Sequence, residues 1–378
     1  MNPLLLMKKV YKIYYSKFKP ERVIGLPARE WAYTPFSDEG TMIRHISIKT
    51  HSELKRFLIE NVPRNVYYSS AYYKTPNAST MEEKGWIGAD LVFDIDADHI
   101  PWALGKKYDL MLEIAKKEMK HLIENFILSD FGFGENDLEI AFSGGRGYHL
   151  RISSLHIRKL SSSSRKEIAD YVYGTDLDKR QLSTFLESGI FTNSGWPNKV
   201  YNFLKNAYMN GASWVVEKFK ERGMDVDDES VRAIIKYADN IFGIKSVKMT
   251  RAEKDKALDS IVAFLRSEID KIVTGDAKRL LRYPSSLHGK TGLLVKKLTL
   301  DELDDFKPLE DAVVLPEKDS QVLIQNVDQN SPVIKALQGV KIKDYEIEII
   351  EGVVSMPLYA AIFVYGLTGV ITSIMVLG

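Results

Sequence analysis

The stretch Leu91–Asp96, with the sequence LVFDID, decides the fold because it predicts a short hydrophobic strand that carries two aspartates. Side chains at positions i and i+2 of a strand point to the same face. We therefore expect Asp94 and Asp96 to project together, while Phe93 and Ile95 pack into the core behind them. Two like charges on a hydrophobic strand destabilise it unless a cation binds them, and Mg²⁺ or Mn²⁺ suits oxygen ligands. A solvated acidic strand end is the alternative interpretation.

A glycine-rich segment, Ser143–His149 with the sequence SGGRGYH, follows a second predicted strand. Its three glycines within five residues allow backbone N–H groups to approach an anion closely. Ser143, Arg146 and His149 add hydrogen-bond donors suited to a triphosphate. His149 and Arg151 share strand parity, so we expect both to face the same cleft. The segment is not a Walker A motif, because it lacks GK[ST] and no long helix follows. A glycine hairpin with an incidental arginine is the alternative.

The segment Lys271–Lys297 is basic, with seven Lys and Arg residues against one acid, Asp276, a net charge of +6. Asp276 would supply a third carboxylate to a metal site that needs more than two protein ligands. His288 and Lys290 could hold phosphate oxygens. Metal ions held by shared carboxylates are the usual device for nucleotidyl transfer, so the three segments together indicate a nucleotide polymerase-type site. A basic surface loop with one salt-bridged aspartate is the alternative.

Composition excludes several classes of protein. The 52 Lys and Arg residues nearly balance the 51 Asp and Glu residues, so any nucleic-acid site must be a local basic patch. With 45% hydrophobic and 27% charged residues, the chain is typical of a folded globular protein. The absence of cysteine excludes disulfides, thiolate zinc sites, iron–sulfur ligation by this chain and a cysteine nucleophile, and it suits a cytoplasmic protein.

The sequence predicts an α/β core interrupted by a helical unit. Strand patterns occupy residues 1–160 and 273–378, interleaved with helices such as the amphipathic stretch 107–127. Residues 161–272 show helical patterns only, including a capping box that begins at Thr250. We therefore expect residues 1–160 and 273–378 to form the catalytic core, with residues 161–272 inserted as an all-helical subdomain.

The C-terminal segment Gly352–Gly378 contains no charged residue, which meets a formal criterion for a membrane span. However, Gly366–Gly369 is typical of a turn, and the flanking runs are rich in β-forming residues. We expect a buried β-hairpin with strands at Tyr359–Tyr365 and Val370–Leu377, and no membrane association. No cationic segment precedes the apolar Met1–Met7, so we expect no signal peptide.

Three motifs resemble those of the archaeo-eukaryotic primases, most closely the catalytic small subunit of archaeal DNA primase. They are Phe93–Asp96 (FDID), Ser143–His149 (SGGRGYH) and Ser286–Lys290 (SLHGK), in this order along the chain. The resemblance extends from about Arg29 to the C-terminus and is strengthened by Met81–Lys84 (MEEK). It implies an α/β core with an RRM-like mixed sheet and a helical subdomain. It also implies de novo primer synthesis on single-stranded DNA from NTPs, and often from dNTPs as well.

The resemblance assigns roles by motif match. It implies that Asp94, Asp96 and Asp276 are the catalytic ligands of Mg²⁺ or Mn²⁺. The positions that match triphosphate-binding residues of the family are Ser143, Arg146, His149, His288 and Lys290. The positions that match residues near the nucleotide in eukaryotic relatives are Arg282, Glu30 and Arg44.

The family also implies a large-subunit partner that carries an iron–sulfur cluster, in a heterodimer or a larger complex. Two departures from the family pattern stand out. Many relatives carry a zinc knuckle after the DxD strand, whereas His99–Lys107 (HIPWALGKK) is short and has no cysteine. Relatives also tend to have a basic residue where Tyr72 or Tyr73 stands, and a tyrosine there could stack on a base instead.

Two other functions fit parts of the pattern. One is an archaeo-eukaryotic-type repair or plasmid polymerase that extends primers but does not start them. The other is a non-catalytic nucleic-acid-binding module, which would account for the aromatic runs but leave three aspartates unexplained. The absence of an appended helicase or ligase domain favours the primase.

Overall fold

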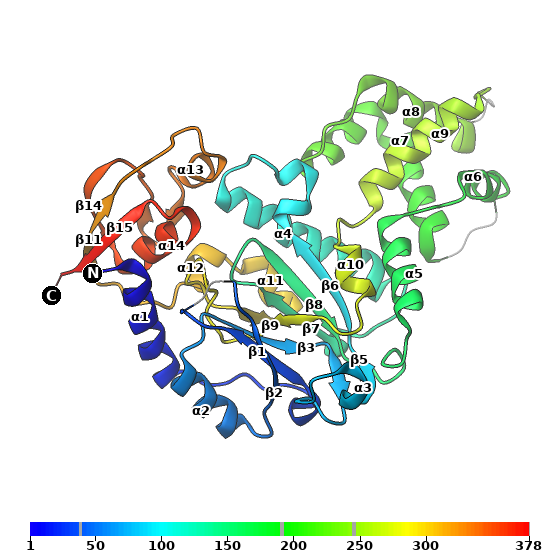
Figure 1. Ribbon diagram of the computed structural model, residues 1–378. Coiled ribbons are helices and arrows are strands. Elements are labelled where there is room, and N and C mark those ends of the chain that lie inside the picture. The colour runs from blue at the N-terminus through cyan, green and yellow to red at the C-terminus, as the bar shows by residue number, and fades with distance from the viewer. Residues whose placement is uncertain (38–39, 190–192, 244–246, 378) are drawn as a thin grey trace.

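The computed structural model describes residues 1–37, 40–189, 193–243 and 247–377. A central region of sheets and helices lies between a group of helices on one side and a small C-terminal sheet on the other (Figure 1). Both chain termini lie next to that small sheet (Figure 1). The architecture is the mixed helix-and-sheet class expected for an archaeo-eukaryotic primase core.

One four-stranded sheet has the order β2 (Ile43–Ser47), β1 (Glu30–Thr34), β3 (Asn65–Ser69) and β9 (Leu280–Arg282). Its neighbouring strands are antiparallel, with Trp31 opposite Tyr68 in the register. The Trp31 and Tyr68 rings stack with centroids 5.4 Å apart, and Tyr283 packs edge-on against Trp31. These buried aromatic side chains form the core on one face of the sheet.

The second four-stranded sheet has the order β10 (Lys296–Leu298), β7 (Leu138–Phe142), β8 (Gly147–Ile152) and β6 (Leu91–Asp96). Phe93 and Ile95 on β6 are fully buried, as expected from strand parity. Helix α4 (Tyr108–Leu122) packs over β6 and β8 and continues through a π-helical turn, which confirms the helix predicted over 107–127. Every strand pair in the described residues is antiparallel, so the sheets are not of the mixed type that the resemblance implied.

The two sheets are joined by buried polar contacts. The hydroxyl of Tyr68 on β3 donates a hydrogen bond to Glu139 on β7 over 2.7 Å. A two-stranded sheet of β4 (Ala71–Tyr73) and β5 (Trp86–Ala89) links β3 to β6 along the chain. The short helix α3 (Met81–Lys84) lies between β4 and β5 and begins with a capping box at Thr80.

The described residues between 161 and 272 form helices and no strand. The helices are α5 (Ser162–Tyr173), α6 (Lys179–Glu187), α7 (Gly195–Glu221), α8 (Asp228–Phe242), α9 (Arg251–Leu265) and α10 (Lys271–Gly275). Helices α7, α8 and α9 pack together away from the sheets (Figure 1). Helix α10, by contrast, packs against α5 and β6, and the Asp270 N–H donates to the Asp94 carbonyl over 2.9 Å. The division into a core and an inserted subdomain stays a prediction.

The C-terminal segment corrects one expectation. Residues Leu358–Thr368 form helix α14 rather than the first strand of a hairpin, and the helix ends at Gly369. The strand that follows is β15 (Ile371–Val376), which pairs with β11 (Asp319–Ile324). On its other edge β11 pairs with β14 (Gly352–Pro357), so β11 is the central strand of this sheet. No helix in the described ranges is long and apolar enough to cross a membrane.

The remaining helices and strands lie outside the sheets described above or connect them. Helix α1 (Pro3–Lys17) is capped by Asn2, whose side chain accepts from the Leu4 N–H. The other elements are α2 (His51–Asn61), α11 (Leu300–Asp305), α12 (Pro308–Asp311), α13 (Pro332–Leu337), β12 (Lys341–Ile342) and β13 (Tyr345–Glu346).

Candidate active site

Asp94 and Asp96 lie at the end of the edge strand β6, opposite His149 and Gly147 on β8. Both aspartates are half-buried. Asp94 Oδ1 lies 3.2 Å from His149 Nε2, and Asp96 Oδ1 accepts from the Asp98 N–H over 3.1 Å. Burial alone would raise the pKa of Asp94, but His149 and two nearby arginines hold it below the usual value. Asp94 is therefore ionised at neutral pH.

The glycine-rich segment runs close beside the aspartate strand. A Cβ at Gly147 would lie 2.2 Å from the Ile95 carbonyl oxygen, and one at Gly144, where φ is +77°, would lie 2.6 Å from the His288 Cβ. Only glycine permits this close approach. The Ser143 hydroxyl oxygen accepts from the Gly145 N–H over 3.2 Å. The glycines thus bring the backbone between the aspartates and the His288 loop.

Arg146 projects from the glycine-rich segment and forms an ion pair with Asp98 at 2.7 Å. The Arg146 side chain is 37% exposed, so it can exchange this partner for a ligand. Asp98 lies in a 3₁₀ turn, Ala97–His99, and therefore past the end of β6. Burial raises the pKa of Asp98 despite the neighbouring Arg146.

His288 is held as a neutral donor beside the glycine-rich segment. Its Nδ1 lies 3.2 Å from the Thr291 backbone nitrogen and 3.0 Å from the Thr291 hydroxyl oxygen, which fixes the orientation of the ring. The Thr291 hydroxyl donates to the Gly144 carbonyl, which ties the two loops together. Burial and the surrounding cations, Arg282 first among them, lower the pKa of His288 well below its ordinary value. Lys290 is exposed at the same loop.

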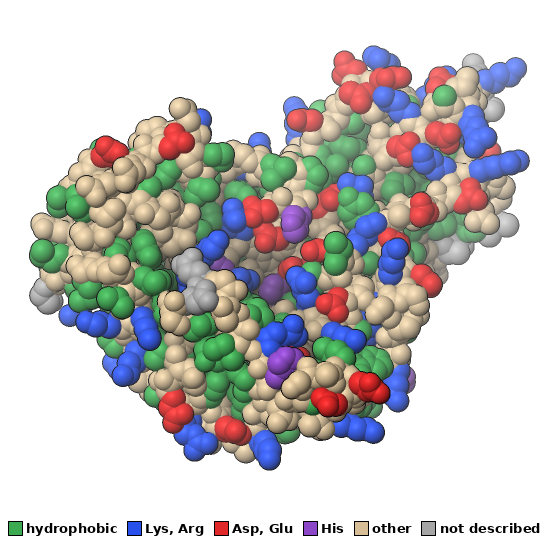
Figure 2. Space-filling view, in the orientation of Figure 1, with side chains coloured by type: hydrophobic (Ala, Val, Ile, Leu, Met, Phe, Trp, Pro, Cys, Tyr) green, Lys and Arg blue, Asp and Glu red, His purple; other side chains and the backbone are tan. Residues whose placement is uncertain are grey.

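Arg282 and Arg64 supply further positive charge. Arg282 on β9 lies opposite Tyr67 and its guanidinium is 5.7 Å from the Tyr67 ring centroid. Its Nε is buried and has no hydrogen-bond partner among the described residues. Arg64, which the sequence interpretation missed, is buried and donates from Nε to the Gly289 carbonyl over 2.7 Å. Figure 2 shows a hollow near the centre of this face, where histidines lie among basic and acidic side chains.

Glu30 does not face the site as a free carboxylate. It is fully buried, with Lys84 Nζ 2.6 Å from Oε2 and Arg44 Nε 3.2 Å from Oε1. Burial alone would raise the pKa of Glu30, but these two cations hold it below the usual value. The Arg44 side chain is 39% exposed, so Glu30 positions a guanidinium that can reach solvent. Lys84 is fully buried, and no sequence signal had identified it as the partner of Glu30.

Asp276 follows helix α10, which packs against β6. Its Oδ1 accepts from the Lys278 N–H over 2.8 Å. In the part of the chain that the structure describes, no group of three His, Cys, Asp or Glu side chains lies close enough to hold a metal ion. The third-ligand role of Asp276 therefore stays a prediction.

The donor chemistry of Asp94 and Asp96 nevertheless fits a divalent cation. Neither carboxylate forms an ion pair with Lys or Arg among the described residues. Mg²⁺ usually binds one or two protein carboxylates and completes its octahedron with waters and substrate phosphates. A carboxylate pair beside a glycine-rich loop is compatible with this mode of binding, which needs no all-protein cage.

Two expectations about nearby residues are wrong. Tyr72 and Tyr73 are buried, so neither can stack on a base. Tyr72 instead donates to Asp90 over 2.8 Å. Arg151 is also buried rather than open to the cleft, and it lies 2.9 Å from Asp90. Asp90 pairs with Arg29 at 2.6 Å as well.

The matching family model and the curated relatives agree on one family. A family model described as DNA primase small subunit matches residues 93–300. The DNA primase small subunit PriS of Methanosarcina mazei is 37% identical over 94% of this chain and 94% of its own length. The protein of the same name from Thermoplasma volcanium is 34% identical over the same shares. Among solved structures, the polymerase domain of Mycobacterium tuberculosis ligase D in complex with DNA has a TM-score of 0.37 at 12% identity, covering 80% of this chain and 83% of that chain.

Proposed function

Because this chain belongs to the DNA primase small subunit family, we propose that it starts DNA synthesis by making short primers on single-stranded DNA without an existing 3′ end. It is the catalytic subunit, a nucleotidyltransferase that acts in DNA replication. The observation that supports its chemistry is the pair of neighbouring carboxyl groups, Asp94 and Asp96, beside a glycine loop and a basic loop. The alternative of a repair or plasmid polymerase is not favoured, since the relatives named above match over 94% of the chain as primase subunits.

Asp94 and Asp96 are the proposed ligands of Mg²⁺ or Mn²⁺, with Asp276 as a further ligand. When bound, the cation supplies charge neutralisation for the triphosphate and favours deprotonation of the attacking hydroxyl. The N–H···O contact between His149 and Asp94 keeps that carboxylate aligned on the strand face. No zinc site with cysteine ligands is proposed, because the chain contains no cysteine.

The triphosphate is proposed to bind between the glycine loop and the His288 loop. His288 is the proposed ring donor to a phosphate oxygen through Nε2, and the contacts of its Nδ1 with the Lys290–Thr291 segment hold the ring in place. Lys290 and Arg146 add charge, and Ser143 shapes the loop through its bond to Gly145. Arg146 exchanges the Asp98 carboxylate for a phosphate oxygen, which is a charge-assisted contact of the same kind.

Arg282 and Arg44 are the proposed cations around the nucleotide outside the triphosphate. Glu30 contributes by holding Arg44, so it is a positioning residue rather than a ligand-contacting one. A nucleotide phosphate could not displace the Glu30 carboxylate from Lys84, because both side chains of this pair are fully buried.

The proposal includes a partner and a place of action. We propose that a large subunit with an iron–sulfur cluster joins this chain, because the family resemblance implies one and this chain has no cysteine to hold a cluster. A role in replication suits a cytoplasmic protein in contact with the template. Co-expression followed by affinity purification tests the partnership, and recovery of this chain alone would argue against it.

Priming on an unprimed circular single-stranded DNA tests the activity. The reaction contains Mg²⁺ or Mn²⁺ with either NTPs or dNTPs, with and without the large subunit. We expect short products that keep a 5′-triphosphate, because synthesis begins from a nucleotide rather than from a 3′ end. Products that form only when a primer is annealed would support the extension-only polymerase instead.

A further inference from the structure

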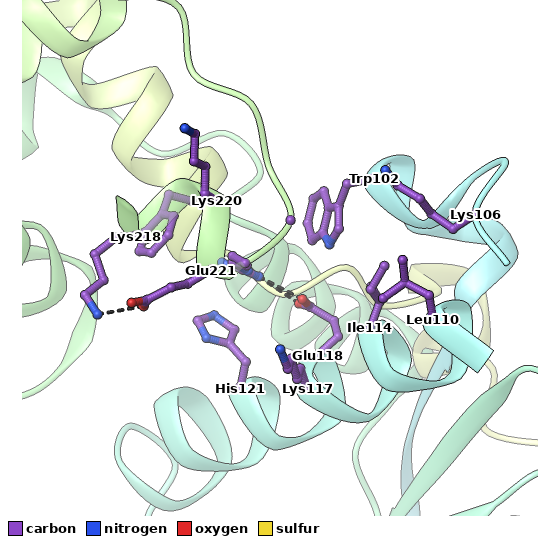
Figure 3. A pocket seen from close by; sticks show the side chains of 13 residues that line it. Trp102, Lys106, Leu110, Ile114, Lys117, Glu118, His121, Lys218, Lys220 and Glu221 are labelled. Atoms are coloured by element: carbon purple, nitrogen blue, oxygen red, sulfur yellow. Dashed lines mark hydrogen bonds and ion pairs between the residues drawn. The ribbon is translucent and has the colours of Figure 1, made fainter. Parts of the chain in front are cut away.

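A pocket of about 420 Å³ lies outside the candidate active site. Figure 3 shows it between helix α4, the segment that carries Trp102 and Lys106, and the C-terminal end of α7. None of the predicted catalytic or nucleotide-binding residues lines it. Its volume is within the range of about 300–1,000 Å³ that is typical of small-molecule sites.

The pocket wall carries an excess of positive charge. Lys106, Lys117 and Lys220 come from three different segments, are exposed, and form no ion pair among the described residues. The two acids in the lining are already paired. Glu221 forms an ion pair with Lys218 at 2.6 Å, and Glu118 forms one with Arg222 at 2.8 Å. Three ammonium groups around one cavity repel each other, so an anion bound between them would be stabilised.

The pocket floor is rigid and aromatic. Arg222 donates two hydrogen bonds to Glu118, at 2.8 and 3.0 Å, and Glu118 also accepts from the Glu268 N–H. The Arg222 guanidinium lies 5.5 Å from the Trp102 ring centroid and 5.6 Å from that of Phe264. These contacts fix one side of the indole, while Trp102 also lines the pocket. An aromatic ring beside lysines suits a ligand that has both a flat ring and a negative charge.

We propose that this pocket binds a nucleotide, with its base against Trp102 and its phosphates on Lys106, Lys117 and Lys220. The nucleotide can be a free nucleoside triphosphate or one unit of a nucleic-acid strand. Lys106 also lines a smaller cavity of about 190 Å³ that contains Asp98 and Arg146 of the candidate active site. The pocket thus lies beside the active site, where both sources of the nucleotide are present.

Tryptophan fluorescence tests the proposal on the full-length chain. The two probes are ATP without divalent metal and a short oligodeoxythymidylate, each titrated at low salt. We expect one of them to give a saturable change that is lost in Trp102→Phe. The other four tryptophans remain in that variant, so the lost part of the signal belongs to Trp102. Saturation by ATP identifies a free nucleotide, and saturation by the oligonucleotide alone identifies a strand.

A charge-reversal pair gives the second readout. Lys117→Glu/Lys220→Glu is expected to weaken the Trp102-dependent binding by about tenfold or more, because two phosphate contacts become repulsive. The matched control, Lys8→Glu/Lys205→Glu, changes the net charge equally at exposed lysines outside the pocket and should leave the midpoint unchanged. The proposal is overturned if neither probe gives a Trp102-dependent change, or if both double variants shift the midpoint equally. Since the readout is binding, it does not depend on whether primer synthesis occurs.

Discussion

Breaking the buried ion pair between Lys84 and Glu30 tests whether Glu30 stabilises the fold, in addition to positioning Arg44. The substitution Lys84→Met keeps the length of the side chain and removes an ammonium 2.6 Å from Glu30 Oε2. Both side chains are fully buried, and breaking such a pair from one side costs about 3–5 kcal/mol. Arg44 remains 3.2 Å from Oε1 and keeps part of the attraction. We therefore expect the free energy of unfolding to fall by about 3 kcal/mol.

Urea unfolding followed by circular dichroism measures this loss. The double variant Lys84→Met/Glu30→Gln removes the uncompensated charge as well, so it should be more stable than Lys84→Met by roughly 1–2 kcal/mol. Lys74→Met, at an exposed lysine, is the control and should change stability by less than about 0.5 kcal/mol. A loss below about 1 kcal/mol for Lys84→Met, or a double variant no more stable than the single one, would refute the reasoning.

Three further outcomes follow from buried contacts. Burial lowers the pKa of His121 to about 4, below about 6.5 in the unfolded chain, so up to about 3 kcal/mol of stability is lost as pH falls between these values. His121→Gln should flatten this slope in urea unfolding at pH 7 and pH 4.5, and equal slopes would contradict it. Gly147→Ala places a Cβ 2.2 Å from the Ile95 carbonyl oxygen and should cost on the order of 3 kcal/mol and abolish priming; normal priming would show that the strands tolerate separation. Tyr72→Phe removes the hydroxyl that donates to Asp90 and should cost about 1–2 kcal/mol while priming by the folded protein stays unchanged; a specific loss of priming would mean that Tyr72 acts in the site.

The aspartate strand and the glycine loop were predictable because a few consecutive residues determine the conformation of each. Strand parity alone places Asp94 and Asp96 on one face, and the structure confirms the strand over Leu91–Asp96. The same rule placed Arg151 on the face of His149 but could not show that Arg151 is buried and paired with Asp90. Parity gives the direction of a side chain, whereas burial depends on the elements that pack above it.

The C-terminal segment shows where a hydrophobic pattern stops being informative. All residues from Leu358 to Val364 are buried, so the helix is apolar on every side. Its sequence therefore lacks the 3.6-residue alternation of apolar and polar residues that identifies an amphipathic helix. The β-branched content then favoured a strand. Only the surrounding structure decides between a buried helix and a buried strand of this length.

The anchor of Glu30 could not be predicted either. Glu30 and Lys84 lie far apart in the sequence, and each is an ordinary charged residue in its own segment. Their pairing arises because α3 and β1 meet in the core. The family resemblance therefore predicted that Glu30 lies near the nucleotide, but it could not distinguish a residue that contacts the nucleotide from one that positions Arg44.

The proposed chemistry depends most directly on the two carboxylates of β6. Primer synthesis on unprimed circular single-stranded DNA, measured for Asp94→Asn/Asp96→Asn, tests them. The matched control Asp109→Asn removes an exposed carboxylate in the first turn of α4. We expect the β6 double variant to remain folded, by circular dichroism, and to lose primer synthesis by at least about a thousandfold, since the proposed cation loses two of its carboxylate ligands. The control should match the unmodified chain. Full synthesis by a clean preparation of the double variant would contradict the site.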